Sequence, residues 1–391
     1  MRFRHSSCIR SIAAFLALAF CLSAFTVSTA ERANPKADKP PRYQAALLIE
    51  AETGQVLFED QADKKLMPAS LVKMMLMLIV AESVKQGAFS LDRKVHISGA
   101  ASRIGGSQVY LKEREVFTLG ELLKAVVIAS ANDAAYSIAE HIAGAPEAMV
   151  QLMNERAREL GLTRTVYTNV HGLPPAPGQS QDYTSARDIS IIAREIVRHP
   201  LLLKWGATVE DTFRNGKFKL YNTNKLLRRF PGMDGIKTGY YEKAGFNLCA
   251  TAKRSGFRLI SVVLGAPTQK GRVRETRKLL TRGFRVYKKV SFFTDGRTIG
   301  KPVAVAQGKK KTTTVVAAKP ISVLVKRIHV PKVKTRITLK RNPIPAPVMK
   351  GQEVGRIEVI VRGRVLASTP LLAAEAVRKK TWLDRLMFWK K

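Results

Sequence analysis

Cysteine is too scarce in this chain to hold a fold together. Only three of the 391 residues are cysteine, and two of them, Cys8 and Cys21, lie in an apolar N-terminal segment. Once that segment is removed, Cys249 has no partner, so an intramolecular disulfide is impossible in the mature chain. A small secreted fold held by disulfides is therefore excluded.

Histidine is also scarce and is scattered along the chain. The six histidines show no His-x-x-x-His spacing, and the chain contains no Cys-x-x-Cys pair. Protein zinc sites are commonly built from ligands spaced in this way. We therefore expect neither a metal nor another cofactor.

Long apolar runs are missing beyond the N-terminus. Leu71–Val80 is the most apolar stretch of the remaining chain, but it is interrupted by Lys73 and is shorter than the roughly 18 residues that span a bilayer. The exception is residues 1–30, where three arginines precede an apolar core at 12–25 and small residues at 28–30. This order is typical of a secretory signal peptide, and we expect an exported protein without multiple membrane spans.

Acidic residues are outnumbered throughout, and most strongly near the C-terminus. The whole chain has 67 Lys and Arg against 30 Asp and Glu, and residues 31–391 retain a net charge of +34. Residues 288–391 contribute +20 of this, from 25 basic and 5 acidic residues. Nucleic acid is a conceivable partner for such a region. We do not expect it, because the export signal removes the protein from nucleic acid and aromatic residues are sparse there before Trp382.

Composition and periodicity divide the mature chain into four parts. Residues 31–42 are charged and contain three prolines, which is typical of a flexible leader. Residues 43–287 show helix patterns clustered in the middle and antiparallel strand patterns at both ends, which predicts one α+β layer domain. Residues 288–377 have short β-branched stretches punctuated by proline and predict a small β-sandwich. Residues 378–391 predict an amphipathic helix that lies on a membrane surface, and a helix docked on the β domain is the alternative.

Several elements of the α+β domain carry clear boundary signals. Antiparallel strands, capped helices and one long helix are expected. The predicted strands are 45–51, 55–59, 245–252 and 257–264, and the predicted helices are 68–87, 118–130, 133–144, 189–198 and 272–287.

The most informative stretch lies at the start of the first helix. Between Pro68 and Glu82 the only polar residues are Ser70 and Lys73. A spacing of three places them on one helical face, so the amine can reach the hydroxyl. Burial of a lysine lowers its pKa toward that of a usable base. The pattern is common by chance, but in apolar surroundings it predicts a nucleophile, Ser70, and its proton acceptor, Lys73.

Two further short motifs are compatible with the same cleft. Ser130 and Asn132 fall at a break between two helices, where they could instead serve only as caps. Lys237, Thr238 and Gly239 open a strand pattern and supply a charge, a hydroxyl donor and a glycine that permits close approach of a ligand.

Taken in order, Ser-x-x-Lys, Ser-x-Asn and Lys-Thr-Gly form the triple signature of penicillin-recognising serine enzymes. Nearly the whole mature chain resembles the D-alanyl-D-alanine carboxypeptidases, the low-molecular-mass penicillin-binding proteins. The stretches that carry the resemblance are Gly106–Leu111, His171–Leu173, Tyr183–Asp188, Asp234–Gly239, Lys243–Leu248 and Lys350–Gly355.

The resemblance implies a hydrolase of peptidoglycan stem peptides that end in D-Ala-D-Ala. Ser70 would form the acyl-enzyme, Lys73 would take its proton, and Ser130 would pass a proton to the leaving amine with help from Lys237. Asn132 would orient the substrate amide.

The resemblance also implies groups that bind the terminal carboxylate and the reacting carbonyl of the substrate. Thr238 would bind the terminal carboxylate beside Gly239, and the backbone N–H groups of Ser70 and Tyr240 would form the oxyanion hole. The resemblance also implies covalent inhibition by β-lactams and a periplasmic location on the outer face of the cytoplasmic membrane.

Two positions depart from the family pattern. Tyr240 stands where many relatives have His, and we expect tuned kinetics because this position acts mainly through its backbone. Thr223 stands where some relatives have an Arg that aids carboxylate binding, so Lys237 and Thr238 would bear more of that load.

The same three motifs also occur in enzymes with other activities, and the sequence excludes only some of these. A class A β-lactamase needs a carboxylate in a Glu-x-x-Leu-Asn loop, yet residues 161–184 contain no Glu and a single acid, Asp182. Slow breakdown of a penicilloyl-enzyme is therefore expected. Transpeptidase or D,D-endopeptidase action on the same site stays open.

Overall fold

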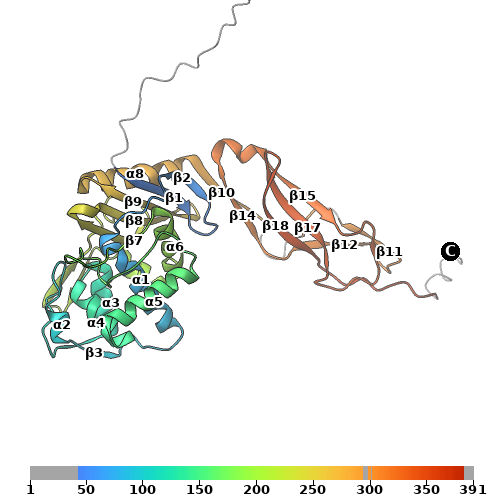
Figure 1. Ribbon diagram of the computed structural model, residues 1–391. Helices are drawn as coiled ribbons and strands as arrows, with labels where there is room; N and C mark the ends of the chain where they lie inside the picture. Colours follow the sequence, from blue (N-terminus) through green and yellow to red (C-terminus); the bar gives the residue numbers. More distant parts are fainter. Residues whose placement is uncertain (1–42, 294–297, 301, 383–391) are drawn as a thin grey trace, which may run out of the picture. The chain divides into compact units, whose positions relative to one another are not determined.

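An antiparallel five-stranded sheet forms the framework of the N-terminal domain in the computed structural model, which describes residues 43–293, 298–300 and 302–382 (Figure 1). The strand order is β2-β1-β9-β8-β7. Its strands are β1 (Ala45–Glu50), β2 (Val56–Asp60), β7 (Met233–Tyr241), β8 (Gly245–Arg254) and β9 (Phe257–Ala266).

Both faces of this sheet are covered. In β1, Leu47 and Ile49 pack into the core shared with the central helices, whereas Ala46 and Leu48 pack into a second core with helix α8 (Gln269–Val286). Successive residues of a strand point to opposite faces. A strand buried along its whole length is therefore sandwiched between two helical layers.

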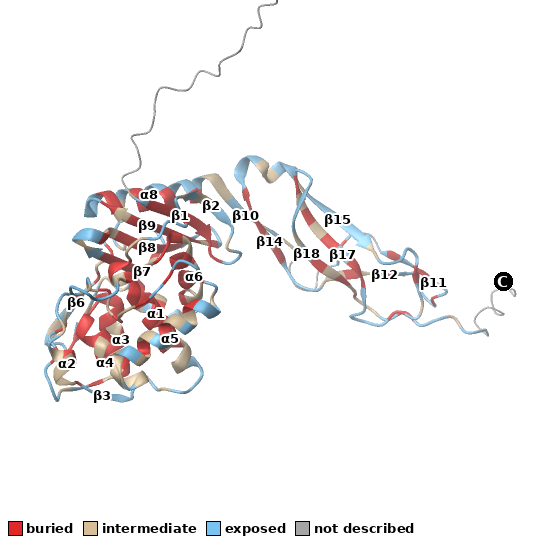
Figure 2. Cartoon of the chain, viewed as in Figure 1, coloured by how far each residue is buried: buried red, intermediate tan, exposed pale blue. Residues whose placement is uncertain are grey.

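The larger layer surrounds helix α1, whose residues 73–78 are at most 1% exposed (Figure 2). Helices α3, α4, α5 and α6 all contact α1. The helices of this layer are α1 (Lys73–Lys85), α2 (Gly99–Ser102), α3 (Leu119–Ile128), α4 (Asn132–Ala143), α5 (Pro146–Glu159), α6 (Ala186–Ile196) and α7 (Pro200–Ala207). Two hairpins accompany them: β3 (Lys94–His96) with β4 (Val116–Thr118), and β5 (Glu210–Phe213) with β6 (Phe218–Tyr221).

Local signals set several helix ends. Thr118 and Glu121 form the predicted capping box at the start of α3. Helix α4 ends at Gly144, whose φ of 80° is left-handed and costs glycine little. Pro200 follows the helix predicted at 189–198 and opens α7, because its missing N–H is not needed in a first turn.

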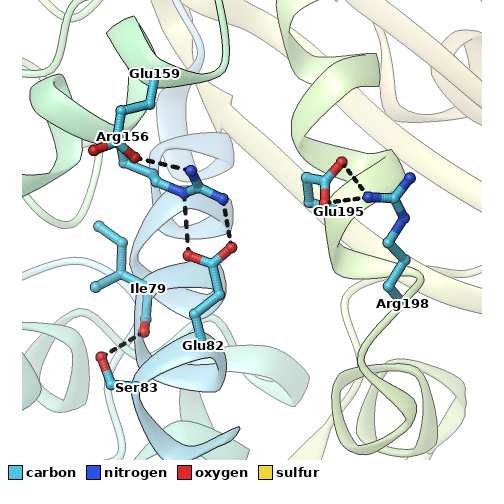
Figure 3. Close-up of polar contacts among 7 residues, drawn as sticks. All are labelled: Ile79, Glu82, Ser83, Arg156, Glu159, Glu195 and Arg198. Atoms are coloured by element: carbon cyan, nitrogen blue, oxygen red, sulfur yellow. Dashed lines mark hydrogen bonds and ion pairs between the residues drawn. The ribbon is translucent and has the colours of Figure 1, made fainter. Parts of the chain in front are cut away.

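A charged clamp joins two helices of the layer. Arg156 on α5 donates to both carboxylate oxygens of Glu82 on α1, at 2.7 and 3.1 Å, and to Glu159 at 2.9 Å (Figure 3). A bidentate arginine–carboxylate pair fixes orientation as well as distance. The clamp therefore fixes the C-terminal half of α1 relative to α5.

In the described part of the C-terminal region, up to residue 382, the regular elements are strands, apart from one 3-10 segment at Arg327–Lys332. Its sheets are β10-β14, β12-β11-β16 and β13-β18-β17-β15, around a shared core of Val, Ile and Leu side chains. The strands are β10 (Tyr287–Phe292), β11 (Val303–Ala306), β12 (Thr312–Thr313), β13 (Val315–Ala317), β14 (Ile321–Lys326), β15 (Val333–Leu339), β16 (Ile344–Pro345), β17 (Glu353–Val361) and β18 (Arg364–Ala373).

The predicted amphipathic helix at 378–391 lies mostly outside the described residues. Its first residues are not helical, because Lys379 forms a β-bridge with Gly308 and the N–H of Lys380 donates to the carbonyl of Gln307 at 2.8 Å. These backbone bonds hold the segment extended, so a helix would begin no earlier than Thr381. Within the part of the chain that the structure describes, no helix is both long and apolar enough to traverse a bilayer.

Candidate active site

Ser70 and Lys73 lie together at the start of α1, as their spacing predicts. A 3-10 turn, Ala69–Val72, precedes the helix, and the Nζ of Lys73 lies 3.0 Å from the Oγ of Ser70. The same amine donates to the carbonyl of His171 at 2.5 Å. These contacts fix the amine beside the hydroxyl.

Lys73 is fully buried, and its surroundings favour the neutral amine. Burial lowers its pKa well below the ordinary value, and the positive charge of Lys237 lowers it further. Asp133 and Asp182 act in the opposite direction but do not reverse the shift. A neutral amine next to a hydroxyl can accept its proton.

The turn that carries Ser70 has an unusual backbone. Ala69 has a φ of +50°, a left-handed value that L-residues rarely adopt. Asn247 on β8, fully buried, donates through Nδ2 to the carbonyls of Met67 and Pro68 at 3.0 and 3.1 Å. The surrounding structure thus holds a conformation that costs about 1–3 kcal/mol on its own.

Two glycines let the backbone close around this turn. A Cβ on Gly172 would come within 2.1 Å of the carbonyl oxygen of Ala69, and one on Gly239 within 2.7 Å of that of Pro68. The Gly239 Cβ would also lie 3.1 Å from the N of Ser70. Strand β7, which contains Lys-Thr-Gly, therefore passes directly beside the nucleophile turn.

The second hydroxyl and the second lysine also meet. Ser130 lies between α3 and α4 with a φ of +64°, and its Oγ accepts from the Nζ of Lys237 at 2.6 Å. Lys237 also donates to the carbonyl of Thr238 at 3.2 Å. The predicted link between the second and third motifs is present as a direct contact.

Lys237 is 1% exposed, and the groups that accept its hydrogen bonds, the hydroxyl of Ser130 and the carbonyl of Thr238, are uncharged. Burial, aided by the positive charge of Arg272, lowers its pKa to about 7. Arg272 lies on α8, 4% exposed, and donates to the carbonyls of Gly239 and Asn247 at 3.3 and 3.0 Å. Burial lowers the pKa of this guanidinium to about 10, so it stays charged at neutral pH.

Asn132 has a free acceptor within the site. Its Nδ2 donates to the carbonyl of Gly105 at 2.7 Å, while its buried Oδ1 has no hydrogen-bond partner. Asp133 fixes the adjacent loop by accepting from the N–H groups of Val109 and Leu111. An unsatisfied buried carbonyl is costly unless a ligand completes it.

Thr238 and Tyr240 lie on either side of Gly239 in β7. The hydroxyl of Thr238 donates to that of Thr223 at 2.7 Å, so the position where relatives have Arg contacts this threonine directly. The ring of Tyr240 is 54% exposed and stacks on Phe246 with centroids 4.0 Å apart.

His171 contributes through its backbone. Its Nδ1 accepts from the N–H of Leu173 at 3.2 Å, and burial together with the charge of Lys73 lowers its pKa to about 4. Asn169 accepts from the N–H groups of His171 and Gly172 through Oδ1. Asn169 thereby positions the carbonyl that receives Lys73.

The structure thus pairs Ser70 with Lys73 and Ser130 with Lys237, and the strand that carries Lys237 passes beside the turn of Ser70. In residues 43–293, 298–300 and 302–382, no cluster of His, Cys, Asp and Glu is suited to a metal. The fold and this geometry define a serine acyl-transfer enzyme.

Comparison with known proteins gives the family. The D-alanyl-D-alanine carboxypeptidase family matches residues 33–268, and the C-terminal domain of penicillin-binding protein 5 matches residues 287–379. The chain therefore belongs to the D-alanyl-D-alanine carboxypeptidases, which are serine enzymes, and the predicted family and α+β fold are confirmed.

Individual relatives cover most of the chain. The carboxypeptidase DacF of Bacillus subtilis is 38% identical over 377 residues, which is 95% of each chain. The structure of penicillin-binding protein 5 from Haemophilus influenzae matches with a TM-score of 0.72 and 33% identity over 86% of this chain and 98% of that one. Penicillin-binding protein D2 from Listeria monocytogenes, solved with ampicillin bound, matches with a TM-score of 0.57 and 32% identity over 62% of this chain and 97% of that one.

Three supporting residues escaped the sequence reasoning: Asn169, Asn247 and Arg272. Asn247 lies in the stretch Lys243–Leu248 that carries the family resemblance, and Arg272 carried a periodicity signal, because it falls on the same face of α8 as the buried Thr276 and Leu280. Because α8 contains several other lysines and arginines, Arg272 could not be singled out from the sequence as a buried residue. The roles assigned to Ser70 and its neighbours stay predictions.

Proposed function

We propose that the protein removes the terminal D-alanine from peptidoglycan stem peptides that end in D-Ala-D-Ala, through an acyl-enzyme on Ser70. The observation that carries this assignment is the buried Nζ of Lys73 at 3.0 Å from the Oγ of Ser70. The groups that contact this amine, the hydroxyl of Ser70 and the carbonyl of His171, are uncharged, so the amine is available as the base.

Acylation begins when the Oγ of Ser70 attacks the carbonyl carbon of the penultimate D-Ala and its proton passes to Lys73. The carbonyl oxygen becomes an oxyanion, which the backbone N–H groups of Ser70 and Tyr240 bind. Loss of one such donor typically costs about 3–4 kcal/mol of transition-state stabilisation. Gly239 supports this role, since it allows β7 to lie against the turn of Ser70.

The peptide bond then breaks as Ser130, which Lys237 holds at 2.6 Å, gives its proton to the leaving amine and takes in return the proton that Lys73 accepted from Ser70. The unpaired Oδ1 of Asn132 accepts from the substrate amide. The terminal carboxylate binds Thr238 and the charge of Lys237. Water attacks the acyl-enzyme in the last step, which releases the shortened peptide and restores Ser70.

The direct test is incubation with a pentapeptide that ends in D-Ala-D-Ala, following free D-Ala. We expect release by the wild type and at least a thousandfold slower release by Ser70→Ala, since the covalent route is lost. Equal release by both proteins would refute Ser70 as the nucleophile.

β-Lactams are proposed covalent inhibitors at the same serine, and the match with an ampicillin-bound relative supports this. β-Lactamase action is the weaker alternative, because the one acid of residues 161–184, Asp182, is occupied by Thr168 and Asn169. Transpeptidase or endopeptidase action would use the same acyl-enzyme, and no observation favours it.

We further propose that the enzyme works in the periplasm on the outer face of the cytoplasmic membrane. Residues 1–30 would direct export, and residues 381–391 would bind the anionic membrane as an amphipathic helix. A chain ending at Trp382 should lose most of its membrane affinity and keep its activity on the pentapeptide. Unchanged sedimentation of that shortened chain with membranes would refute the role of the helix.

A further inference from the structure

Three segments meet at the end of the β domain where the described chain stops, near β11 and β12 (Figure 1). Residues 307–311 pair with 378–380, and Val348 and Val377 exchange backbone hydrogen bonds at 2.8 and 2.9 Å. We call this group, residues 307–311, 348–352 and 374–382, the basic end. These backbone bonds define one connected surface formed by distant parts of the sequence.

The basic end has a strong charge imbalance. Its three segments contain seven Lys and Arg and one acid, Glu375, which pairs with Lys310. The side chains of Lys311, Lys350 and Arg378 are exposed. A single carboxylate cannot neutralise this surface, which therefore presents a concentrated positive field.

Large apolar side chains are exposed among these cations. Met349 is 71% exposed, and Trp382 is 69% exposed. Basic side chains beside an exposed methionine and tryptophan match the interface of a bilayer, where charges meet headgroups and apolar side chains enter the acyl boundary. A soluble polyanion would use the charges and leave Met349 and Trp382 in water.

We propose that the basic end is itself a binding surface for anionic phospholipid, in addition to the C-terminal helix proposed above. The folded loops at 307–311 and 348–352 contribute contacts that do not depend on residues 383–391. The β domain then lies on the membrane through two adjoining elements, which restricts its tilt more than a single helix does.

The test is the partition of the full chain onto vesicles of phosphatidylcholine alone or mixed equally with phosphatidylglycerol. The variant Lys311→Glu with Lys350→Glu removes charge at the basic end. The matched control is Lys332→Glu with Lys334→Glu, because both lysines are exposed and β15 pairs Lys334 with Ile360, near the other end of β17. Both variants change the net charge equally.

We expect the basic-end variant to bind mixed vesicles at least ~25-fold more weakly, given roughly fivefold per basic residue at an anionic surface. The control variant should lose much less, and Met349→Ser should weaken binding without any change of charge. Equal losses in both charge variants, or none in either, would overturn the proposal. So would a basic-end variant that loses affinity only for soluble polyphosphate.

A chain that ends at Trp382 separates this surface from the C-terminal helix. We expect it to retain weak affinity for mixed vesicles, which the Lys311 and Lys350 reversals abolish. D-Ala release from a soluble pentapeptide should be the same in all these variants. A loss of that activity would count against the enzymatic proposal. A shortened chain with no affinity for mixed vesicles would refute the proposal that the basic end binds anionic phospholipid.

Discussion

At the scale of single residues, the two site lysines differ in the charge that their tasks require. In the proposed mechanism, Lys73 must be neutral to accept a proton from Ser70, whereas Lys237 must be charged to attract a carboxylate. Burial lowers the pKa of Lys73 well below its ordinary value, and the charge of Lys237 supports this shift. The pKa of Lys237 is lowered to about 7 by burial and by Arg272. The charge on Lys237 is therefore lost as pH rises through about 7.

The fall of kcat/KM at alkaline pH, the alkaline limb of the pH profile, is a test of Lys237. As pH rises through about 7, the free enzyme loses the charge on Lys237, so kcat/KM for a carboxylate-bearing substrate should fall. In Lys237→Arg the guanidinium stays charged, so the ratio of kcat/KM at pH 9 to that at pH 7 should rise toward one. An identical ratio in wild type and variant would show that another group causes the fall.

Arg272 offers a second test of the same alkaline limb, because its charge lowers the pKa of Lys237 from helix α8. Removing its charge in Arg272→Met should raise the pKa of Lys237 and move the alkaline limb to higher pH. Arg274→Met is the control, because Arg274 is half exposed and pairs with Glu275. The pH profile of kcat/KM measures the shift independently of the fraction folded. A limb that moves equally in both variants would refute the electrostatic role.

At the scale of elements, the site depends on loops that press against the turn of Ser70. Gly172 has a φ of +74° and would place a Cβ 2.1 Å from the Ala69 carbonyl oxygen. Gly178, in the same connection, has a φ of +81° with no atom within 4 Å of its Cβ position. Alanine substitutions at Gly172 and Gly178 therefore distinguish the cost of a left-handed backbone, present at both, from steric overlap, present only at Gly172.

Gly178→Ala should cost only the left-handed strain of about 1–2 kcal/mol, which lowers Tm by a few degrees. Gly172→Ala should lower Tm further and should also reduce acylation per folded molecule, because the carbonyl of His171 that holds Lys73 must move. Thermal unfolding and penicillin acylation rates measure the two effects. Similar values for both alanine variants would argue against a close approach of Gly172 to the carbonyl of Ala69.

The elements themselves were partly predictable. Thr118, Glu121 and Gly144 mark helix ends by chemistry that is local in sequence, so their prediction was confirmed. Helix α5, Pro146–Glu159, was missed although its proline stands at the first turn. The Lys-Thr-Gly motif was expected to open a strand, yet it lies within β7, which begins at Met233.

At the scale of the whole molecule, spacing could indicate which residues react but not what supports them. The approach of Gly172 to Ala69 joins segments about a hundred residues apart, and no local pattern encodes it. The same holds for Asn247, which fixes the nucleophile turn from another layer of the fold. The family and its fold were predictable, whereas the domain bounds near residues 287 and 377 stay predictions.

The account rests on Ser70 as the residue that becomes acylated, with Lys73 as its base. The most direct measurement is intact-protein mass spectrometry after brief exposure to a penicillin, followed by peptide mapping. We predict one penicilloyl group per wild-type chain, on the peptide that contains Ser70, and none on Ser70→Ala. An adduct on another residue, or one that forms equally on Ser70→Ala, would contradict the account.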